Sequence, residues 1–185
     1  GEVIREYKIT KRTVTLKSAD LSKSYDGTEL VNGETALETE TGWADGEGAT
    51  YTFTGSQTLV GSSKNTFTYT LKSNTEAGNY TITKTAGSLT VTAKSVSGMK
   101  VDKPSNQQYD GKEHKWEPTV QDGEKTLEKG TDYTVAYNKS DFTNVTGTIK
   151  VTITGKGNYE GEVIREYKIT KRTVTLKSAD LSKSY

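Results

Sequence analysis

Residues 1–25 and residues 161–185 of the chain are identical. Both segments read GEVIREYKITKRTVTLKSADLSKSY, without one change. Chance does not produce an identity of this length, so we expect the chain to come from a tandem array whose full repeat runs from residue 1 to residue 160. The chain then holds one full repeat plus an overhang, and its ends are boundaries of a fragment.

A fainter repeat lies inside the first. The triplet YDG occurs at residues 25–27 and again at 109–111. A triplet GNY follows each of them, at residues 78–80 and 157–159, and leads into a last alternating stretch. The full repeat is therefore interpreted as two related domains, each about half of its length.

The two triplets set the domain boundaries. We place the first domain at residues 12–94 and the second at residues 95–172. Residues 1–11 are then the last strand of a preceding domain of the second type, and residues 173–185 begin the next domain of the first type. Because residues 1–11 lack the rest of their domain, we expect them to be disordered or to pair with another molecule by strand exchange.

The local pattern predicts strands throughout. Polar and apolar residues alternate with period two, as in antiparallel sheets that have one solvated face. Asp-Gly and Gly-Asn pairs, which tolerate the positive φ of tight turns, separate these stretches. No window keeps a helical period, although residues 28–46 could hold a short helical turn. The alternating stretches are residues 65–72, 79–84, 88–94, 131–138, 147–155 and 163–171.

The predicted fold class is all-β, with two tandem small antiparallel β domains in an elongated arrangement. Two folds are open for each domain, an Ig-like sandwich and a β-grasp-like sheet. We favour the sandwich because no helix is evident.

Composition excludes several classes of function. The 25 basic and 24 acidic residues balance, which argues against nucleic acid as a partner. No run reaches 18 apolar residues, so we predict no membrane insertion. The chain has no cysteine, a single histidine (His114) and none of the common catalytic motifs, and we predict no enzymatic activity and no cofactor.

Four aromatic residues are the candidate ligand contacts. Tyr25 and Tyr109 belong to the YDG triplets, and Trp43 and Trp116 lie in loop-like sequence. Exposed rings of this kind can stack on sugars. The alternative, which we favour, is that the triplets form Asp-capped turns and that the rings fill a thin core.

An acidic cluster occupies the middle of the first domain, at Glu34, Glu38, Glu40, Asp45 and Glu47. A calcium site needs six to eight converging oxygen atoms, about 2.3–2.6 Å from the ion. The spacing of these residues fits no loop of that type. We interpret the cluster as a solvated surface and predict no metal site.

The sequence resembles the YDG or MBG-type tandem repeats of Gram-positive bacterial cell-surface, adhesin-like proteins. The segments that carry the resemblance are SKSYDGTEL, GNYTIT and GSLTVTAK in the first half, and GTDYTVAYN and GKGNYEGEVIREYKITKR in the second. It covers nearly the whole repeat. The resemblance implies an extracellular protein on the bacterial surface, anchored to the cell wall in its full-length form.

The expected function is that of a structural spacer or stalk, which projects a distal binding domain of a surface adhesin. The strand EYKITK runs into RTVTLKS with no Gly, Ser or Pro between them, whereas flexible linkers are longer and rich in Gly and Ser. The partners of each repeat are then its neighbours in the same chain. The alternative is a module that binds a host glycan or an extracellular matrix protein weakly and acts by avidity.

Overall fold

The computed structural model describes residues 1–33, 36–178 and 183. Strands make up 44% of it and helical residues 3%, which confirms the all-β class. The chain divides into two compact units, residues 1–94 and residues 95–185. Each unit is described by itself.

The first unit contains ten strands and one short 3-10 helix among its described residues. In chain order they are β1 (Arg12–Lys17), β2 (Leu21–Ser24), β3 (Leu30–Val31), β4 (Thr39–Thr41), β5 (Ala49–Phe53), β6 (Ser56–Gln57), β7 (Gly61–Asn65), β8 (Phe67–Leu71), η1 (Ala77–Asn79), β9 (Tyr80–Thr85) and β10 (Gly87–Thr92).

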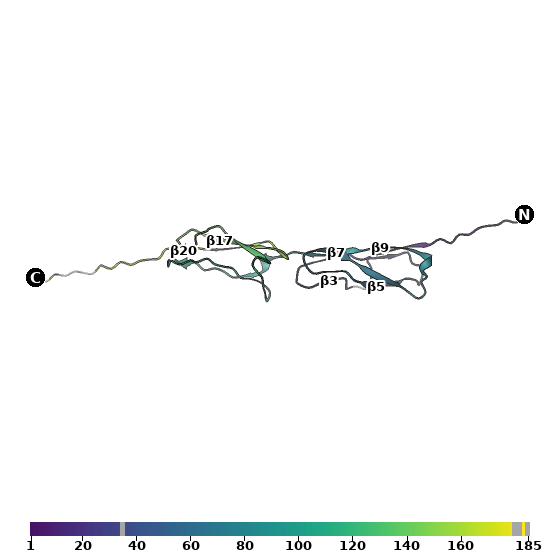
Figure 1. Ribbon diagram of the computed structural model, residues 1–185, viewed down its shortest axis with the longest axis horizontal. Coiled ribbons are helices and arrows are strands. Elements are labelled where there is room, and N and C mark those ends of the chain that lie inside the picture. The colour runs from purple at the N-terminus through teal and green to yellow at the C-terminus, as the bar shows by residue number, and fades with distance from the viewer. Residues whose placement is uncertain (34–35, 179–182, 184–185) are drawn as a thin grey trace. The chain divides into compact units, whose positions relative to one another are not determined.

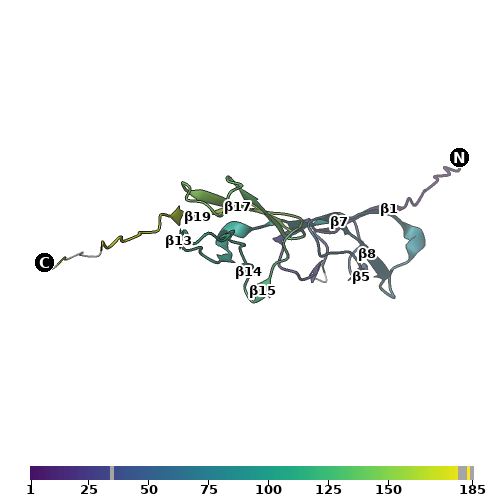
Figure 2. The ribbon, with the colours of Figure 1, turned by 60° about the vertical axis from the view of Figure 1, so that its left-hand side comes forward.

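Two layers of sheet enclose the core of the first unit. One layer holds the sheets β4-β1-β9 and β2-β10-β7, and the other holds the pairs β5-β8 and β3-β6. Figures 1 and 2 both show β5 in a different layer from β7. Inward residues of β1, β8 and β9 form the core, because alternation turns every second side chain to the same side. These buried residues are Val14, Leu16, Phe67 and Tyr80.

The beginning and the end of the first unit lie side by side and run in the same direction. β1 pairs with β9 in parallel from Arg12 opposite Tyr80, and β2 pairs with β10 in parallel from Leu21 opposite Leu89. In both pairs of strands, residues that lie opposite each other are separated by the same number of residues in the sequence. The opening and closing segments of the unit therefore form one long parallel pair in a single register, interrupted only between the strands.

The second unit combines three longer strands, β16, β17 and β19, with several of two or three residues. In chain order they are β11 (Lys94–Ser95, at the boundary), η2 (Val96–Gly98), β12 (Lys100–Val101), β13 (Gln107–Gln108), β14 (Val120–Asp122), β15 (Lys125–Thr126), β16 (Tyr133–Tyr137), β17 (Ile149–Gly155), β18 (Tyr159–Glu160), β19 (Glu162–Tyr167) and β20 (Ile169–Thr170).

The core of the second unit lies against the sheet β16-β17-β19. Figure 2 shows β17 and β19 apart from the second sheet, which contains β14 and β15. The buried cluster draws on β17, β19, β20 and the loop after β16, and Trp116 and Tyr137 pack against it. Its members are Phe142, Ile149, Val151, Tyr167 and Ile169.

The parallel pairs are a feature that the sequence pattern did not predict. Antiparallel pairs form most of the sheets, but β1-β9, β2-β10 and β13-β20 are parallel. Period-two alternation reports which face of a strand is buried, and it carries no information about the direction of the neighbouring strand. The expected antiparallel sheets are thus supplemented by parallel pairing, between the two ends of the first unit and between β13 and the last strand of the second.

Candidate functional site

The first YDG triplet forms a tight turn directly after β2. The carboxylate of Asp26 accepts hydrogen bonds from the Lys23 ammonium and from the backbone N–H of Thr28, both at 2.8 Å. These contacts, the lysine first, hold the pKa of Asp26 far below its usual range. Gly27 has a φ of +80°, a conformation that L side chains rarely adopt. Tyr25 is half-buried beside this turn.

The second YDG triplet repeats this construction after β13. The carboxylate of Asp110 accepts from the backbone N–H of Lys112 at 2.9 Å, and His114 Nε2 lies 2.8 Å from the same oxygen. Both contacts lower the pKa of Asp110, the backbone N–H most. Gly111 has a φ of +83°. Tyr109 is exposed, with 38% of its surface accessible. The geometry of both triplets is that of an Asp-capped turn.

Trp43 packs into the first unit. Its ring meets that of Tyr80 edge-on, with the centroids 4.9 Å apart, and it contacts the buried cluster around Leu16. The hydroxyl of Tyr80 in turn donates to Glu47, which raises the pKa of the tyrosine. Trp43 is half-buried, and its ring packs against the core of the first unit.

Trp116 is held by its backbone between two tyrosines. Its N–H donates to the hydroxyl of Tyr167 at 3.2 Å, and its carbonyl oxygen accepts from the hydroxyl of Tyr137 at 2.8 Å. The hydroxyl of Tyr167 also donates to the carbonyl oxygen of His114 at 2.9 Å. The indole is half-buried and packs against the core cluster of the second unit.

An open depression of about 350 Å³ lies beside Trp116. Its lining combines an aromatic face with polar groups that can donate hydrogen bonds, which is the chemistry that a sugar ring requires. The structure thus brings Trp116 together with His114, whereas Tyr25 and Trp43 lie in the other unit. The polar and aromatic lining includes Lys103, Ser105, Gln107, His114, Lys115 and Trp116.

The acidic residues of the first unit have separate partners. Glu38 pairs with Lys17 at 2.7 Å, and Glu40 accepts from the hydroxyl of Tyr51 at 2.6 Å. Asp45 is exposed, and Glu34 lies outside the described residues. Across residues 1–33, 36–178 and 183, no group of three or more His, Cys, Asp or Glu side chains could hold a metal ion.

The repeated 25-residue segment occurs in two environments. Its first part, residues 1–11, forms no strand at the start of the chain, but the same letters at residues 161–171 supply β19 and β20. Its remaining part supplies β1 and β2 at the start of the chain, whereas residues 172–178 form no strand. Within the described residues, the letters of β19 and β20 form strands only in the second copy, and those of β1 only in the first.

A buried serine ties the opening and closing segments of the first unit together. The hydroxyl of Ser18 donates to the carbonyl oxygen of Asn65 at 2.5 Å and accepts from the backbone N–H of Gly87 at 2.9 Å. The side-chain amide of Asn65 donates to the carbonyl oxygen of Ala19 at 2.8 Å. Sequence reasoning missed this bridge, because the KSAD stretch is polar and looks like an exposed turn. The GSLTVT stretch offered one signal, a glycine at the start of a strand.

Comparisons with known proteins identify no family for this chain. No protein-family model matches the sequence, and searches of curated proteins and of solved structures found no match. Within the described residues, no helix has the length and apolar character of a bilayer span.

Proposed function

We propose that the chain is a tension-bearing spacer, a pair of repeat units in the stalk of a bacterial cell-surface adhesin that projects a distal binding domain. The observation that carries the proposal is the parallel pairing between the opening and closing segments of the first unit, with a shorter parallel pair that holds the last strand of the second unit. In the first unit β1 pairs with β9 and β2 pairs with β10, whereas in the second unit the last strand, β20, pairs with β13, which follows β11 and β12.

Parallel terminal segments resist tension along the chain. A pull on both ends of the first unit drags β1 and β2 one way and β9 and β10 the other. The inter-strand hydrogen bonds lie across this direction, so they must shear together rather than open one at a time. Bonds at Tyr25 N–H to Thr92 O and at Ser18 N–H to Thr85 O extend the row beyond the strands.

The connection between successive repeats is short. In the first copy of the repeated segment β1 begins at Arg12, and in the second copy β20 ends at Thr170. When both parts are structured at one junction, a single residue, Lys171, separates the closing strand from the opening strand. A junction without flexible residues favours an extended array over domains that move independently of one another.

The resemblance to YDG or MBG-type repeats supports the same proposal. It gives the location as extracellular, on the surface of a Gram-positive bacterium, and the partners as neighbouring repeats of the same chain. This location is argued from the sequence segments alone.

A solution measurement tests whether the array is extended. Small-angle scattering from a protein of two full repeats should give a maximum dimension close to the summed lengths of its four units, with a rod-like cross-section. A shorter, ensemble-like profile would count against it. The matched control carries the insertion Gly-Ser-Gly-Ser after Lys171, which should shorten the measured dimension if the junction is stiff.

Single-molecule pulling tests the resistance to tension directly. The chain has no cysteine, so one engineered cysteine gives a unique handle. Pulling from the two termini should shear the first unit. Pulling between the N-terminus and Asp45→Cys should instead unzip β1 from β4, because β4 is antiparallel to β1 and Asp45 lies on the Arg12 side of that pair. We expect a several-fold lower unfolding force in the second geometry, and equal forces would exclude the shear argument.

A second candidate function is weak glycan binding at the depression beside Trp116, repeated along an array to give avidity. The depression and its lining favour it. A multi-repeat protein should then bind a glycan or extracellular matrix array, and Trp116→Ala in every repeat should abolish the signal. Trp43→Ala is the matched control, because Trp43 lies in the other unit and packs against its core. Retained binding by the Trp116 variant, or no binding by the unmodified array, excludes this candidate.

A further inference from the structure

The depression beside Trp116 is bordered by basic side chains without a carboxylate among them. Two lysines, Lys103 and Lys115, line it together with His114, and no described Asp or Glu belongs to the lining. The whole chain carries 25 basic and 24 acidic residues, so the excess of basic groups is local to the depression. A concave surface lined by groups of one sign attracts a ligand of the opposite sign.

Lys103 supplies a cation that the protein leaves without a counter-charge. Its side chain is exposed, and its ammonium group forms no ion pair or hydrogen bond with any residue that the structure describes. The group is therefore available to an anionic ligand at no cost in lost internal contacts.

Lys115 is held at the depression by the aromatic residues beneath its ammonium group. The Nζ atom lies 5.0 Å from the centroid of the Tyr137 ring and 5.9 Å from that of Phe142. An aromatic face attracts a cation in this position. The two lysines come from different segments of the second unit, Lys103 from before β13 and Lys115 from after the second YDG turn.

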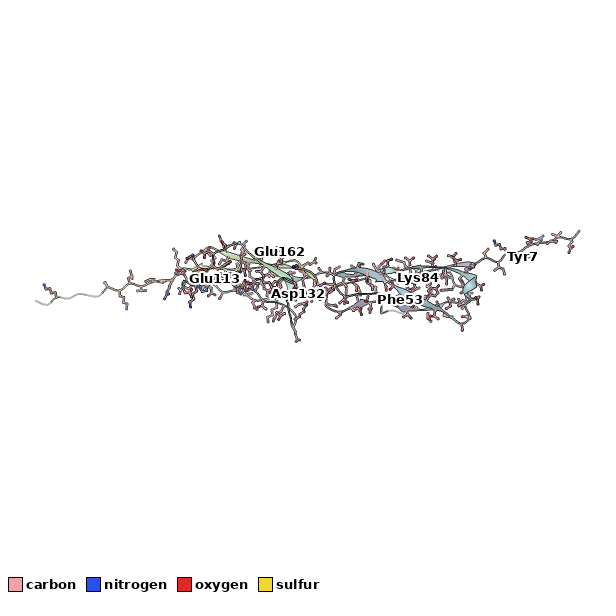
Figure 3. All side chains as sticks on the ribbon, viewed as in Figure 1. Tyr7, Phe53, Lys84, Glu113, Asp132 and Glu162 are labelled. Carbon is pink, nitrogen blue, oxygen red and sulfur yellow. The ribbon has the colours of Figure 1, made fainter. Side chains whose placement is uncertain are left out.

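The carboxylates near the depression have partners of their own. Asp110 lies 2.8 Å from His114 Nε2, and Glu117 accepts from Lys129 at 2.5 Å and pairs with Lys115 at 3.2 Å. Glu113, which is labelled in Figure 3 and precedes His114, is exposed and does not line the depression. These acidic groups therefore leave the charge of Lys103 uncompensated.

The remaining lining suits a sugar ring. The indole of Trp116 is half-buried, and its backbone is fixed by the hydroxyls of Tyr137 and Tyr167, so an aromatic face is in place for stacking. The hydroxyl of Ser105 accepts from Gln107 Nε2 at 2.9 Å. This contact leaves the Ser105 hydroxyl hydrogen to donate to a ligand and Gln107 Oε1 to accept from a sugar hydroxyl.

We propose that the depression binds a sugar that carries a carboxylate group, a uronic acid or a sialic acid. The ring stacks on Trp116, and the carboxylate pairs with Lys103 and Lys115. A neutral sugar leaves Lys103 without an anion, and a simple anion leaves the indole uncovered. The inference rests on the second candidate function, weak glycan binding, and it is independent of the spacer role. All the lining residues belong to the second unit, so one unit carries the whole site.

Proton–nitrogen NMR of the full chain tests the inference. The chain has two tryptophans, one in each unit, and therefore gives two indole N–H signals, which Trp43→Phe assigns. Titration with methyl glucuronide or with a methyl sialoside should shift the Trp116 signal to saturation and leave the Trp43 signal in place. The acidic sugar that binds more tightly identifies the source, a uronic acid of a matrix polysaccharide or a sialic acid of a host glycan.

Matched probes separate the carboxylate from the ring. Methyl glucoside and the methyl ester of the sialoside keep the ring without the charge, and acetate keeps the charge without the ring. Each should bind about ten-fold more weakly than the acidic sugar. Equal binding of the neutral sugars would overturn this inference and leave glycan binding standing. Equal binding of acetate would overturn it in favour of a general anion site, and no shift with any sugar would overturn both.

Lysine variants test the two cations. Lys103→Gln and Lys115→Gln should each weaken binding of the acidic sugar by about two- to five-fold. Lys139→Gln is the matched control, because it removes the same charge from an exposed position of the same unit outside the depression. The NMR spectrum of each variant shows directly that the unit remains folded. Equal weakening by all three substitutions would mean that the sugar responds only to net charge, and the proposal would fail.

Discussion

Tyr7 and Tyr167 occupy the same position of the same repeated segment, yet Tyr7 is almost fully exposed and Tyr167 is almost fully buried. Local sequence preference is identical for the two residues. The difference in exposure between Tyr7 and Tyr167 therefore comes from the neighbouring strands β17 and β13, which pair with the segment of Tyr167 and not with that of Tyr7. Comparison of the two copies therefore isolates the contribution of tertiary packing to strand formation.

The first prediction uses that pair. Tyr167→Ala removes a buried ring and two hydrogen bonds, so the free energy of unfolding of the second unit should fall by about 3–5 kcal/mol. Tyr7→Ala should change stability by less than about 0.5 kcal/mol, as for other exposed positions. Urea unfolding at low protein concentration, followed by far-UV circular dichroism, measures both. A loss of similar size for Tyr7→Ala would mean that the N-terminal segment is packed after all.

The second prediction concerns the serine bridge. Ser18→Ala leaves the carbonyl oxygen of Asn65 and the N–H of Gly87 buried without this partner. Each such group costs about 1–3 kcal/mol, so the first unit should lose several kcal/mol of stability. Ser22→Ala, at an exposed position of β2, is the matched control and should be nearly neutral. Equal urea midpoints for the two variants would show that the bridge contributes nothing.

The third prediction concerns the close approach of β10, at Gly87, to the connection between β1 and β2. A Cβ there would lie 2.3 Å from the carbonyl oxygen of Ala19 and 2.5 Å from that of Ser18, and both are backbone atoms that cannot move aside alone. Gly87→Ala should therefore destabilise the first unit by about 1–3 kcal/mol or more. Gly98→Ala meets no atom within 4 Å and serves as the control. Thermal unfolding of both variants measures the difference, and a neutral Gly87→Ala would rule out the tight contact.

The fourth prediction is a pH dependence that arises from the two YDG turns. Folding lowers the pKa of Asp26 and Asp110 from the ordinary value of 3.8. A carboxyl group whose pKa is lower in the folded state stabilises the fold at pH values above its unfolded-state pKa. This contribution is lost as the pH falls through the folded-state pKa. Stability should therefore decline as the pH drops below about 4.

Asparagine substitutions isolate this effect. Asp26→Asn and Asp110→Asn keep a side-chain oxygen that can accept from the turn but remove the ionisable group. The double variant should be less stable than the unmodified chain at neutral pH and should show a shallower decline in acid. Denaturant titrations between about pH 2 and pH 7 compare the slopes, and parallel slopes would assign the acid sensitivity to other carboxylates.

The class of fold was predictable because period two is a local property. Residues 147–155 and 163–171 alternate clearly, and they form β17 and the pair β19 and β20. The Asp-Gly turns were equally predictable, since Asp caps its own backbone and Gly supplies positive φ. Both features depend on residues within a few positions of one another.

The structural features that could not be predicted depend on contacts between residues far apart in the sequence. The alternation in residues 12–17 is satisfied by a parallel or an antiparallel neighbour, so it could not identify β9. Ser18 looks like a solvent-exposed turn residue until Asn65 and Gly87 are brought to it. A ligand-binding role stays a prediction for the four aromatic candidates, Tyr25, Tyr109, Trp43 and Trp116. Of these, Trp116 borders the depression in the second unit.

The division of the repeated segment between two units has a genetic consequence. Its first part is structured in the unit that it closes, and its second part is structured in the unit that it opens. Recombination anywhere within two identical copies of the segment regenerates the same sequence, with every strand still joined to the unit that needs it. In the tandem array that we propose, whole repeats can therefore be gained or lost without creating a new junction sequence.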